Sequence, residues 1–174
     1  MKTFDYILRN WRYRIAESYV TNVSDMLDIG GYDGSFLRRV NDRIKKGICI
    51  DPLSEDKKEG KLVFIKSRIG DKLPFSDNSF DIVSMLAVYE HLGQHRETIT
   101  SEVFRILKPH GIALLTIPSR AVDYIIKILL KIKMVDAISF EEHDHFKSSD
   151  VIQIFEGCGF RLKHWSRFQF GLNK

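Results

Sequence analysis

The chain has few of the features that mark secreted, membrane-spanning or low-complexity proteins. Only two of its 174 residues are cysteine and only four are proline. Two thiols cannot build a disulfide framework and are typical of a reduced, intracellular protein. No apolar run approaches the roughly 20 residues that span a bilayer, and the first residues lack the apolar core of a signal peptide. We therefore expect a cytoplasmic protein.

The composition is that of an ordinary globular domain. Hydrophobic residues make up 44% of the chain and charged residues 29%, and the length suits one domain covering residues 1–174. The 27 lysine and arginine residues against 23 aspartate and glutamate residues give a net charge of +4. This excess is too small to indicate nucleic acid as a partner, and we expect none.

Short apolar runs alternate with segments of helical periodicity along most of the chain. Each run is apolar throughout, which is typical of strands in a parallel sheet covered on both faces. Right-handed crossovers then give a doubly wound α/β fold. The expected strands are 25–29, 47–51, 62–65, 80–86, 111–117 and 161–170. The expected helices are 4–20, 35–44, 96–107, 120–135 and 148–155.

Ligands of such sheets bind beyond the carboxyl ends of the strands, where this sequence places two carboxylates. Asp28 precedes a glycine-rich turn that contains Gly30 and Gly31, and Asp51 follows 23 residues later at the end of the next strand. The turn lets a ligand approach the backbone closely, and Asp51 can accept hydrogen bonds from a ribose diol. An acid before the turn suits a cationic ligand group and would repel a pyrophosphate.

Other interpretations of these residues stay open. The turn can be an ordinary strand-to-helix connection, and Asp51 can be the N-cap of a helix. A nicotinamide oxidoreductase is a rival function, but the G-x-G-x-x-G pattern fails because Tyr32 and Ser35 stand at glycine positions.

Four blocks in order resemble the class I S-adenosylmethionine-dependent methyltransferases, in their small-molecule branch. They are MLDIGGYDGSFL, GICIDP, LPFSDNSFDIVSMLAVYEHL and SEVFRILKPHGIALLTIPS, and the resemblance covers about residues 24–160. It implies a Rossmann-like fold, S-adenosyl-L-methionine as cofactor and a small molecule as methyl acceptor. The residues that it assigns to the cofactor are Asp28, Gly30, Gly31 and Tyr32 for the methionine part, Asp51 and Pro52 for the ribose, Arg68 and Ile69 for the adenine, and Leu86 and Ala87 beside the methionine chain.

The sequence departs from the family pattern at three places. Tyr32 stands where the family has the middle glycine of its first motif, and Arg68 or Ile69 replaces an acid near the adenine. His110 replaces the second glycine of K-P-G-G. The first two departures favour an alternative function, a non-catalytic cofactor-binding or partner-regulating protein of the same fold.

Two pairs of residues are candidates for catalysis. Glu90 and His91 follow the fourth expected strand, beside the expected methyl group, and can act as base and orienting residue. Some similar quinone O-methyltransferases have E-x-x-E-H here and use a metal, but Ala87 replaces the first acid, so we expect no metal. His143 and His145 would point the same way from an extended segment and can accept a proton. The alternatives are that His91 packs under a lid and that 143–145 is a surface loop.

The last third of the chain is expected to cover the site. Residues 120–135 form a basic amphipathic segment, which indicates either a lid or a weak membrane-surface contact. Related enzymes end in a strand hairpin, and only one strand fits here, so that an open sheet edge favours a homodimer. The expected layout is an N-terminal helix at 1–23, a cofactor core at 24–119, a lid or acceptor insert at 120–147 and a C-terminal helix and strand at 148–174.

Overall fold

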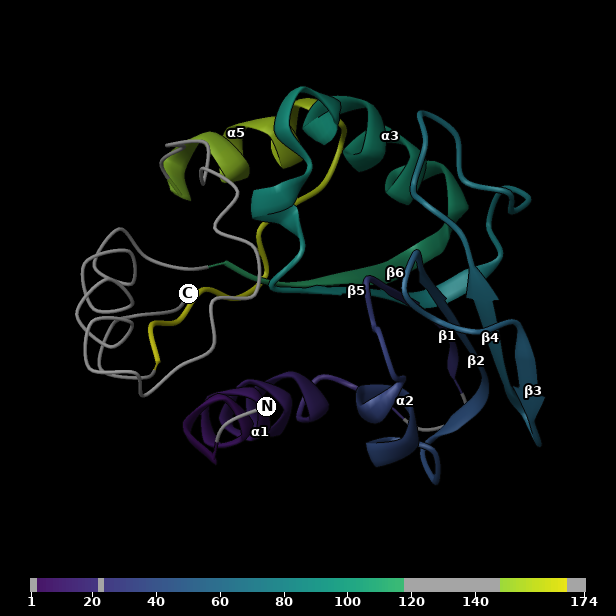
Figure 1. Cartoon of the computed structure of the whole chain (residues 1–174). Coiled ribbons are helices and arrows are strands. Elements are labelled where there is room, and N and C mark those ends of the chain that lie inside the picture. Colours follow the sequence, from purple (N-terminus) through teal and green to yellow (C-terminus); the bar gives the residue numbers. More distant parts are fainter. Residues whose placement is uncertain (1–2, 22–23, 118–147, 169–174) are drawn as a thin grey trace.

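The computed structural model describes residues 3–21, 24–117 and 148–168 (Figure 1). The expected helix 120–135 and the candidate residues His143 and His145 lie outside these ranges. Within them, no helix combines the length and the apolar character needed to cross a membrane.

The described elements form one six-stranded sheet with the order β3-β4-β2-β1-β5-β6. Neighbouring strands run parallel except β3 and β4, which are antiparallel. The chain moves outward from β1 through β2 to β4 and then returns to the other side of β1 with β5. The strand order therefore reverses at β1 and β5, and the carboxyl ends of these two strands flank the crevice where such sheets bind ligands. The strands are β1 (Ser24–Ile29), β2 (Ile44–Asp51), β3 (Lys57–Glu59), β4 (Leu62–Lys66), β5 (Phe80–Leu86) and β6 (Leu107–Thr116).

Helices cover both faces of the sheet, which confirms the predicted doubly wound fold. Figure 1 shows α3 and α5 on one side of the strands and α1 and α2 on the other. Side chains alternate between the two faces along each strand: Leu27 and Ile29 of β1 join the core under α3 and α5, and Met26 joins the core over α1 and α2. The helices are α1 (Thr3–Glu17), α2 (Ser35–Arg39), α3 (Arg96–Ile106) and α5 (Ser148–Gly157), with 3₁₀ turns η1 (Tyr89–His91) and η2 (Gly93–His95).

Several boundaries differ from the prediction, and one short strand was not predicted. α1 ends at Glu17 and not at residue 20, β2 begins at Ile44 and not at residue 47, and α5 ends at Gly157 and not at residue 155. α2 ends at Arg39 because Ile44, which fits the helical spacing, is the first residue of β2. β6 begins at Leu107, since the register against β5 shifts between Phe80 and Ile82 and so accommodates the turn before residue 111. β3 was not predicted because it is short and consists of three charged, exposed residues, as edge strands often do.

The prediction of a late strand over 161–170 is wrong for residues 161–168, the part of this range that the structure describes. Residues 161–167 form no strand, and Phe168 makes only an isolated bridge. The alternating apolar residues that suggested a strand do not share a buried face, because Leu162 is 52% exposed and Trp165 is 38% exposed. Among the described strands, the sheet therefore ends at β6.

Candidate functional site

The loop that follows β1 packs tightly against the end of β5. Gly30 has a φ of 71°, and a Cβ atom on it would lie 2.4 Å from Cγ2 of Val88. A Cβ atom on Gly31 would lie 2.3 Å from Oδ2 of Asp28. The two glycines therefore let the backbone of the loop lie directly on Asp28 and Val88.

Asp28 lies beneath this loop rather than at its surface. It is 2% exposed, and its Oδ1 accepts a 2.6 Å hydrogen bond from Ser84 Oγ. Its Oδ2 is buried and has no hydrogen-bond partner in the described structure. Burial raises the pKa of Asp28 to about 7; the Ser84 hydrogen bond opposes this rise, and the charges of Asp51 and Asp33 add to it. A cation above the loop would favour the ionised form.

Asp51 fixes the far side of the same loop from the end of β2. Its Oδ2 accepts the N–H of Tyr32 at 3.0 Å, and its Oδ1 accepts the N–H of Leu53 at 2.7 Å. A carboxylate has about four lone-pair positions, so each oxygen can still accept one hydroxyl. No helix begins between β2 and β3, so Asp51 caps a tight turn and is not a helix N-cap.

Tyr32 keeps its ring outside the loop. Its φ of 48° lies in the left-handed region, and its side chain is 55% exposed. Besides the bond from its N–H to Asp51, its carbonyl accepts a hydrogen bond from Ser54 Oγ. The backbone of Tyr32 is therefore held as the loop requires, while the aromatic ring lies at the surface beside the site.

The other residues that the resemblance assigned to the cofactor lie around this centre. Pro52 and Arg68 are exposed, and Ile69 is half-buried against the core. The N–H of Ser67 donates to the carbonyl of Asp51 at 3.3 Å, which brings the start of this segment to the end of β2.

Leu86 and Ala87 lie at the carboxyl end of β5. The N–H of Ala87 donates to the carbonyl of Thr116 at 3.0 Å, and its φ is 60°. Leu86 is half-buried and packs against the core on the α1 side of the sheet.

The candidate catalytic pair follows directly in the turn η1. Glu90 is only 6% exposed, whereas His91 is exposed. Arg96 donates to the carbonyls of Tyr89 and Glu90 at 3.3 and 3.1 Å and so fixes this turn on α3. The described residues contain no cluster of three or more potential metal ligands.

Residues of α1 reach the same region, although none of them belongs to a motif that indicates a role in the site. The ring of Tyr13 packs on Phe36, with the ring centroids 5.2 Å apart. Burial raises the pKa of Tyr13 to about 12, and the nearby charge of Asp28 adds to the rise. Arg9 lies 3.5 Å from Asp33 in the loop after β1. The spacing of 9, 12, 13 and 16, which puts these residues on one helix face, was the available signal.

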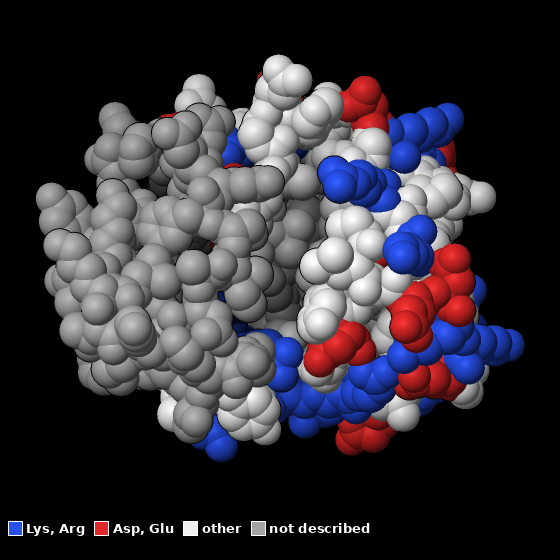
Figure 2. All heavy atoms as spheres, viewed as in Figure 1, with Lys and Arg blue, Asp and Glu red and all other residues white. Residues whose placement is uncertain are grey.

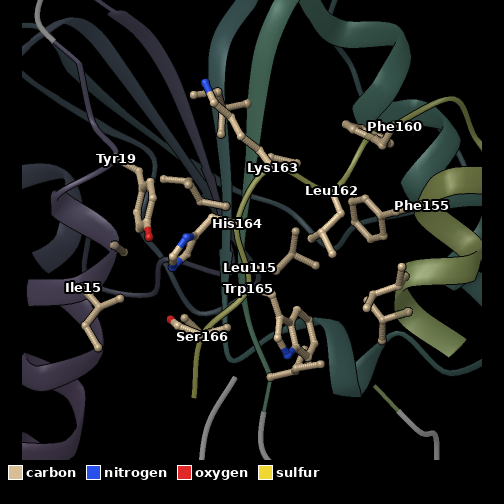
Figure 3. A pocket seen from close by; sticks show the side chains of 18 of the residues that line it. Ile15, Tyr19, Leu115, Phe155, Phe160, Leu162, Lys163, His164, Trp165 and Ser166 are labelled. Atoms are coloured by element: carbon tan, nitrogen blue, oxygen red, sulfur yellow. The ribbon is translucent and has the colours of Figure 1, made fainter. Parts of the chain in front are cut away.

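A hollow of about 520 Å³ follows the outer edge of β6 and reaches Leu86 (Figure 3). In the close-up, Tyr19 and His164 face one another, and Leu115, Phe155 and Leu162 lie across the hollow from α1. The rings of Tyr19 and His164 are 5.5 Å apart. The hollow borders residues 110–117, which are most of β6 and the residue after it, so it lies beside the sheet edge and not over the tips of β1 and β2.

Comparison with known proteins agrees with this geometry. The methyltransferase domain family matches residues 27–115, which is about half of the chain. A demethylmenaquinone methyltransferase of Lactiplantibacillus plantarum is 28% identical over 117 residues, covering 57% of this chain and 48% of that protein. A protein of Encephalitozoon cuniculi named as a methyltransferase is 34% identical over 112 residues, covering 62% and 52%. The matched region is thus about half the length of these curated relatives.

A solved structure supports the fold independently. A chain in a complex between the Haloferax volcanii Trm112 methyltransferase activator and a methyltransferase superposes with a TM-score of 0.66 at 20% identity, covering 87% of this chain and 69% of that one. The parallel sheet, the glycine loop between two carboxylates and the family match agree. The chain belongs to the class I S-adenosylmethionine-dependent methyltransferases.

Proposed function

We propose that the chain binds S-adenosyl-L-methionine at the carboxyl ends of β1 and β2 and transfers its methyl group to a small molecule. The observation that carries the proposal is the pair of carboxylates, Asp28 and Asp51, joined by a loop that exposes backbone between them. Both carboxylates are almost fully buried, at 2% and 7% exposure, so their positions are well defined.

The residues present fit this cofactor part by part. Asp51 would accept the ribose hydroxyls with the lone pairs that Tyr32 and Leu53 leave free. Asp28, once ionised, would stabilise an ammonium group above Gly31 by its charge. Pro52, Arg68 and Ile69 would border the adenine, and Leu53, which is 73% exposed beside Asp51, offers it an apolar surface. Leu86 and Ala87 would lie beside the methionine chain.

The reaction asks the protein mainly to position the reactants. When bound, S-adenosylmethionine supplies a methyl group on a positively charged sulfur, which is already an activated electrophile. The protein then orients the acceptor and excludes water. Glu90 would take a proton from the acceptor where the nucleophile has to lose one, and His91 would orient the acceptor. His143 and His145 are proposed as further groups of the acceptor site.

The first experiment is calorimetry with S-adenosylmethionine and S-adenosylhomocysteine. We expect Asp51→Ala to weaken binding of both by about 1–3 kcal/mol, because charge-assisted hydrogen bonds to the ribose are lost. Asp56→Ala is the matched control, since Asp56 also accepts a backbone N–H, from Lys66 at 2.7 Å, but is exposed and outside the loop. Unchanged affinity in a folded Asp51→Ala variant would mean that the ribose is held elsewhere.

The second experiment is turnover on a panel of acceptors. The panel includes a demethylated quinone, because the L. plantarum relative is named for such a substrate. Methyl transfer to any member identifies the acceptor class and supports the enzyme.

A second candidate function is a non-catalytic, cofactor-binding protein that regulates a partner. Two observations favour it: Tyr32 occupies a position with left-handed backbone that suits glycine, and a neighbour in structure was solved as a complex of a methyltransferase with its activator protein. Cofactor binding without turnover on the whole panel would favour this function over the enzyme.

A further inference from the structure

Two half-buried arginines of α1, Arg9 and Arg12, lie beside the candidate site, and their hydrogen bonding is incomplete among the residues that the structure describes. Arg9 and Arg12 are three residues apart, so they project from the same side of the helix. The Nε atom of each is buried and has no hydrogen-bond acceptor among the residues that the structure describes. Burial lowers the pKa of Arg12, and the positive charge of Arg9 lowers it further. The nearby Glu90 and Tyr13 act in the opposite direction and raise it. Two neighbouring guanidinium groups whose Nε donors are buried without an acceptor lower the stability of the folded state.

Other arginines of the chain show how this side chain is normally satisfied here. Arg38 donates through Nε and Nη2 to both oxygens of Glu59 at 2.9–3.0 Å. Arg105 donates through Nε and Nη2 to Glu102 at 2.8 and 2.6 Å, and the Nε of Arg96 donates to the carbonyl of Tyr89. Arg38 and Arg105 thus make the two-point contact with a carboxylate that guanidinium geometry favours. Within the described ranges, Arg9 and Arg12 make no such contact.

No acid among the described residues makes such a two-point contact with Arg9 or Arg12. Asp33 approaches one nitrogen of Arg9 at 3.5 Å, and no hydrogen bond accompanies the contact. The guanidinium of Arg9 lies 5.8 and 5.9 Å from the ring centres of Tyr6 and Tyr13, a loose contact with two aromatic faces. Glu90 influences Arg12 through its charge.

The position of the pair indicates what it faces. Asp33 belongs to the glycine loop, and Glu90 follows β5, so the two arginines span the crevice between β1 and β5. Figure 2 shows Lys and Arg side chains gathered over α1 and α2 on this face of the molecule. An anion held between the two guanidinium groups would supply their missing acceptors and offset their mutual repulsion.

We propose that Arg9 and Arg12 together bind a carboxylate of a ligand at the mouth of the site. The inference rests on the proposed function for the identity of the site. Two ligands can supply this carboxylate: the amino-acid end of the cofactor, or an acidic methyl acceptor. In the second case the acceptor class is narrowed to small carboxylic acids.

The test uses the full chain and the variant Arg12→Gln, with Arg14→Gln as matched control. Arg14 is on the same helix, carries the same charge and is exposed. Binding is measured by calorimetry for S-adenosylhomocysteine and for 5′-methylthioadenosine, which lacks the amino-acid end. If the cofactor supplies the carboxylate, Arg12→Gln weakens S-adenosylhomocysteine by about 10- to 100-fold and leaves methylthioadenosine unchanged. Arg14→Gln changes neither.

The second arm detects a carboxylate from the acceptor. Acetate is titrated at constant ionic strength into the chain saturated with S-adenosylhomocysteine, and the melting temperature is followed. If the acceptor supplies the carboxylate, acetate raises the melting temperature of the wild-type and Arg14→Gln chains but not that of Arg12→Gln, whose nucleoside affinities stay unchanged. Equal nucleoside affinities and an equal acetate response in Arg12→Gln and wild type overturn the proposal.

One further variant and one further titration distinguish a failed proposal from a variant that does not fold or a chain that binds no nucleoside. Arg12→Lys keeps the charge but not the two-point geometry, so it should show an intermediate loss, and it replaces Arg12→Gln if that variant does not fold. If the wild-type chain binds neither nucleoside, the proposed function fails. The acetate titration of the free chain then still decides whether the two arginines form a carboxylate site.

Discussion

The strand β1 has a carboxylate near each end, and the two lie in opposite environments. Asp25, at the amino end, is joined to Asp81 of β5: its N–H donates to Asp81 at 2.7 Å, and Lys108 contacts the two carboxylates at 3.0 and 2.8 Å. Asp28, at the carboxyl end, has one hydrogen bond from Ser84 and one buried oxygen with no partner among the described residues.

The pKa values of the two regions differ accordingly. At the amino end, partial burial would raise the pKa of Asp81, but the hydrogen bonds from Lys108 and from the N–H of Asp25 lower it. At the carboxyl end, burial raises the pKa of Asp28 to about 7. One end of the sheet is therefore arranged for stability, whereas the other keeps a poorly stabilised acid where a ligand is expected. Such a departure from local consistency is typical of functional sites.

The largest effect is expected from Asp28→Asn, which removes the acid from the carboxyl end. Because the folded pKa of Asp28 lies above the usual value, the folded state binds more protons than the unfolded state between about pH 4 and 7. The wild-type chain therefore loses stability as the pH rises through this window. Asp28→Asn avoids this loss, and its advantage in unfolding free energy should grow to on the order of 4 kcal/mol above pH 7. Chemical denaturation at several pH values measures it.

The same variant tests the role of Asp28 in binding. Cofactor affinity of the wild-type chain should fall as the pH drops below about 7, because a protonated Asp28 no longer attracts the ammonium group. In Asp28→Asn the affinity should be lower at pH 8 and nearly independent of pH. A wild-type affinity that does not change between pH 8 and 6 contradicts this role for Asp28.

A smaller effect is expected at the amino end from Lys108→Met. The two carboxylates lose their shared cation, but Lys108 is 34% exposed and Asp81 is 37% exposed, so water screens much of the effect. We expect a loss of about 1 kcal/mol at neutral pH. The lowered folded-state pKa of Asp81 gives stability that is lost as the pH falls through that pKa. The difference between Lys108→Met and the wild type should therefore shrink as the medium becomes more acidic than the usual pKa of an aspartate.

Cofactor affinity provides the contrast between the two ends. Lys108→Met should leave it unchanged, whereas Asp28→Asn should lower it. A drop in affinity for Lys108→Met would mean that the two ends are coupled through β1. The amino end would then contribute to cofactor binding and not to stability alone.

The sequence allowed the sheet to be predicted because buried parallel strands are apolar throughout. β5 was predicted at its observed bounds, and β1 and β4 within one residue. The glycine loop and Asp51 could be placed because both directly follow such strands. Local pattern therefore sufficed wherever a residue's role depends on its own strand.

The parts that were missed depend on contacts between distant segments. Arg12 and Tyr13 of α1 lie close enough to Glu90 and Asp28, respectively, to interact with their charges. Only the folded chain brings this helix to the crevice. Likewise, alternating apolar residues at 161–167 fit a strand, but whether they pair depends on what lies beside β6. Periodicity reports the preference of a segment and not its neighbours.

The smallest effects are expected from substitutions at two positions with left-handed backbone, one at each end of the sheet. Tyr32 has a φ of 48° and His110 a φ of 67°, and both stand where the family sequence has glycine. A side chain in the left-handed region costs about 1 kcal/mol, so Tyr32→Gly and His110→Gly should each stabilise the chain by about 0.5–1 kcal/mol, measured by denaturation. His110→Gly should not change cofactor affinity. Tyr32→Gly keeps the N–H that Asp51 binds and removes a ring that is mostly exposed, so affinity should change less than about threefold. A larger gain in affinity would show that the Tyr32 ring obstructs the ligand. In that case Tyr32 would lower both the stability of the fold and the affinity for the cofactor.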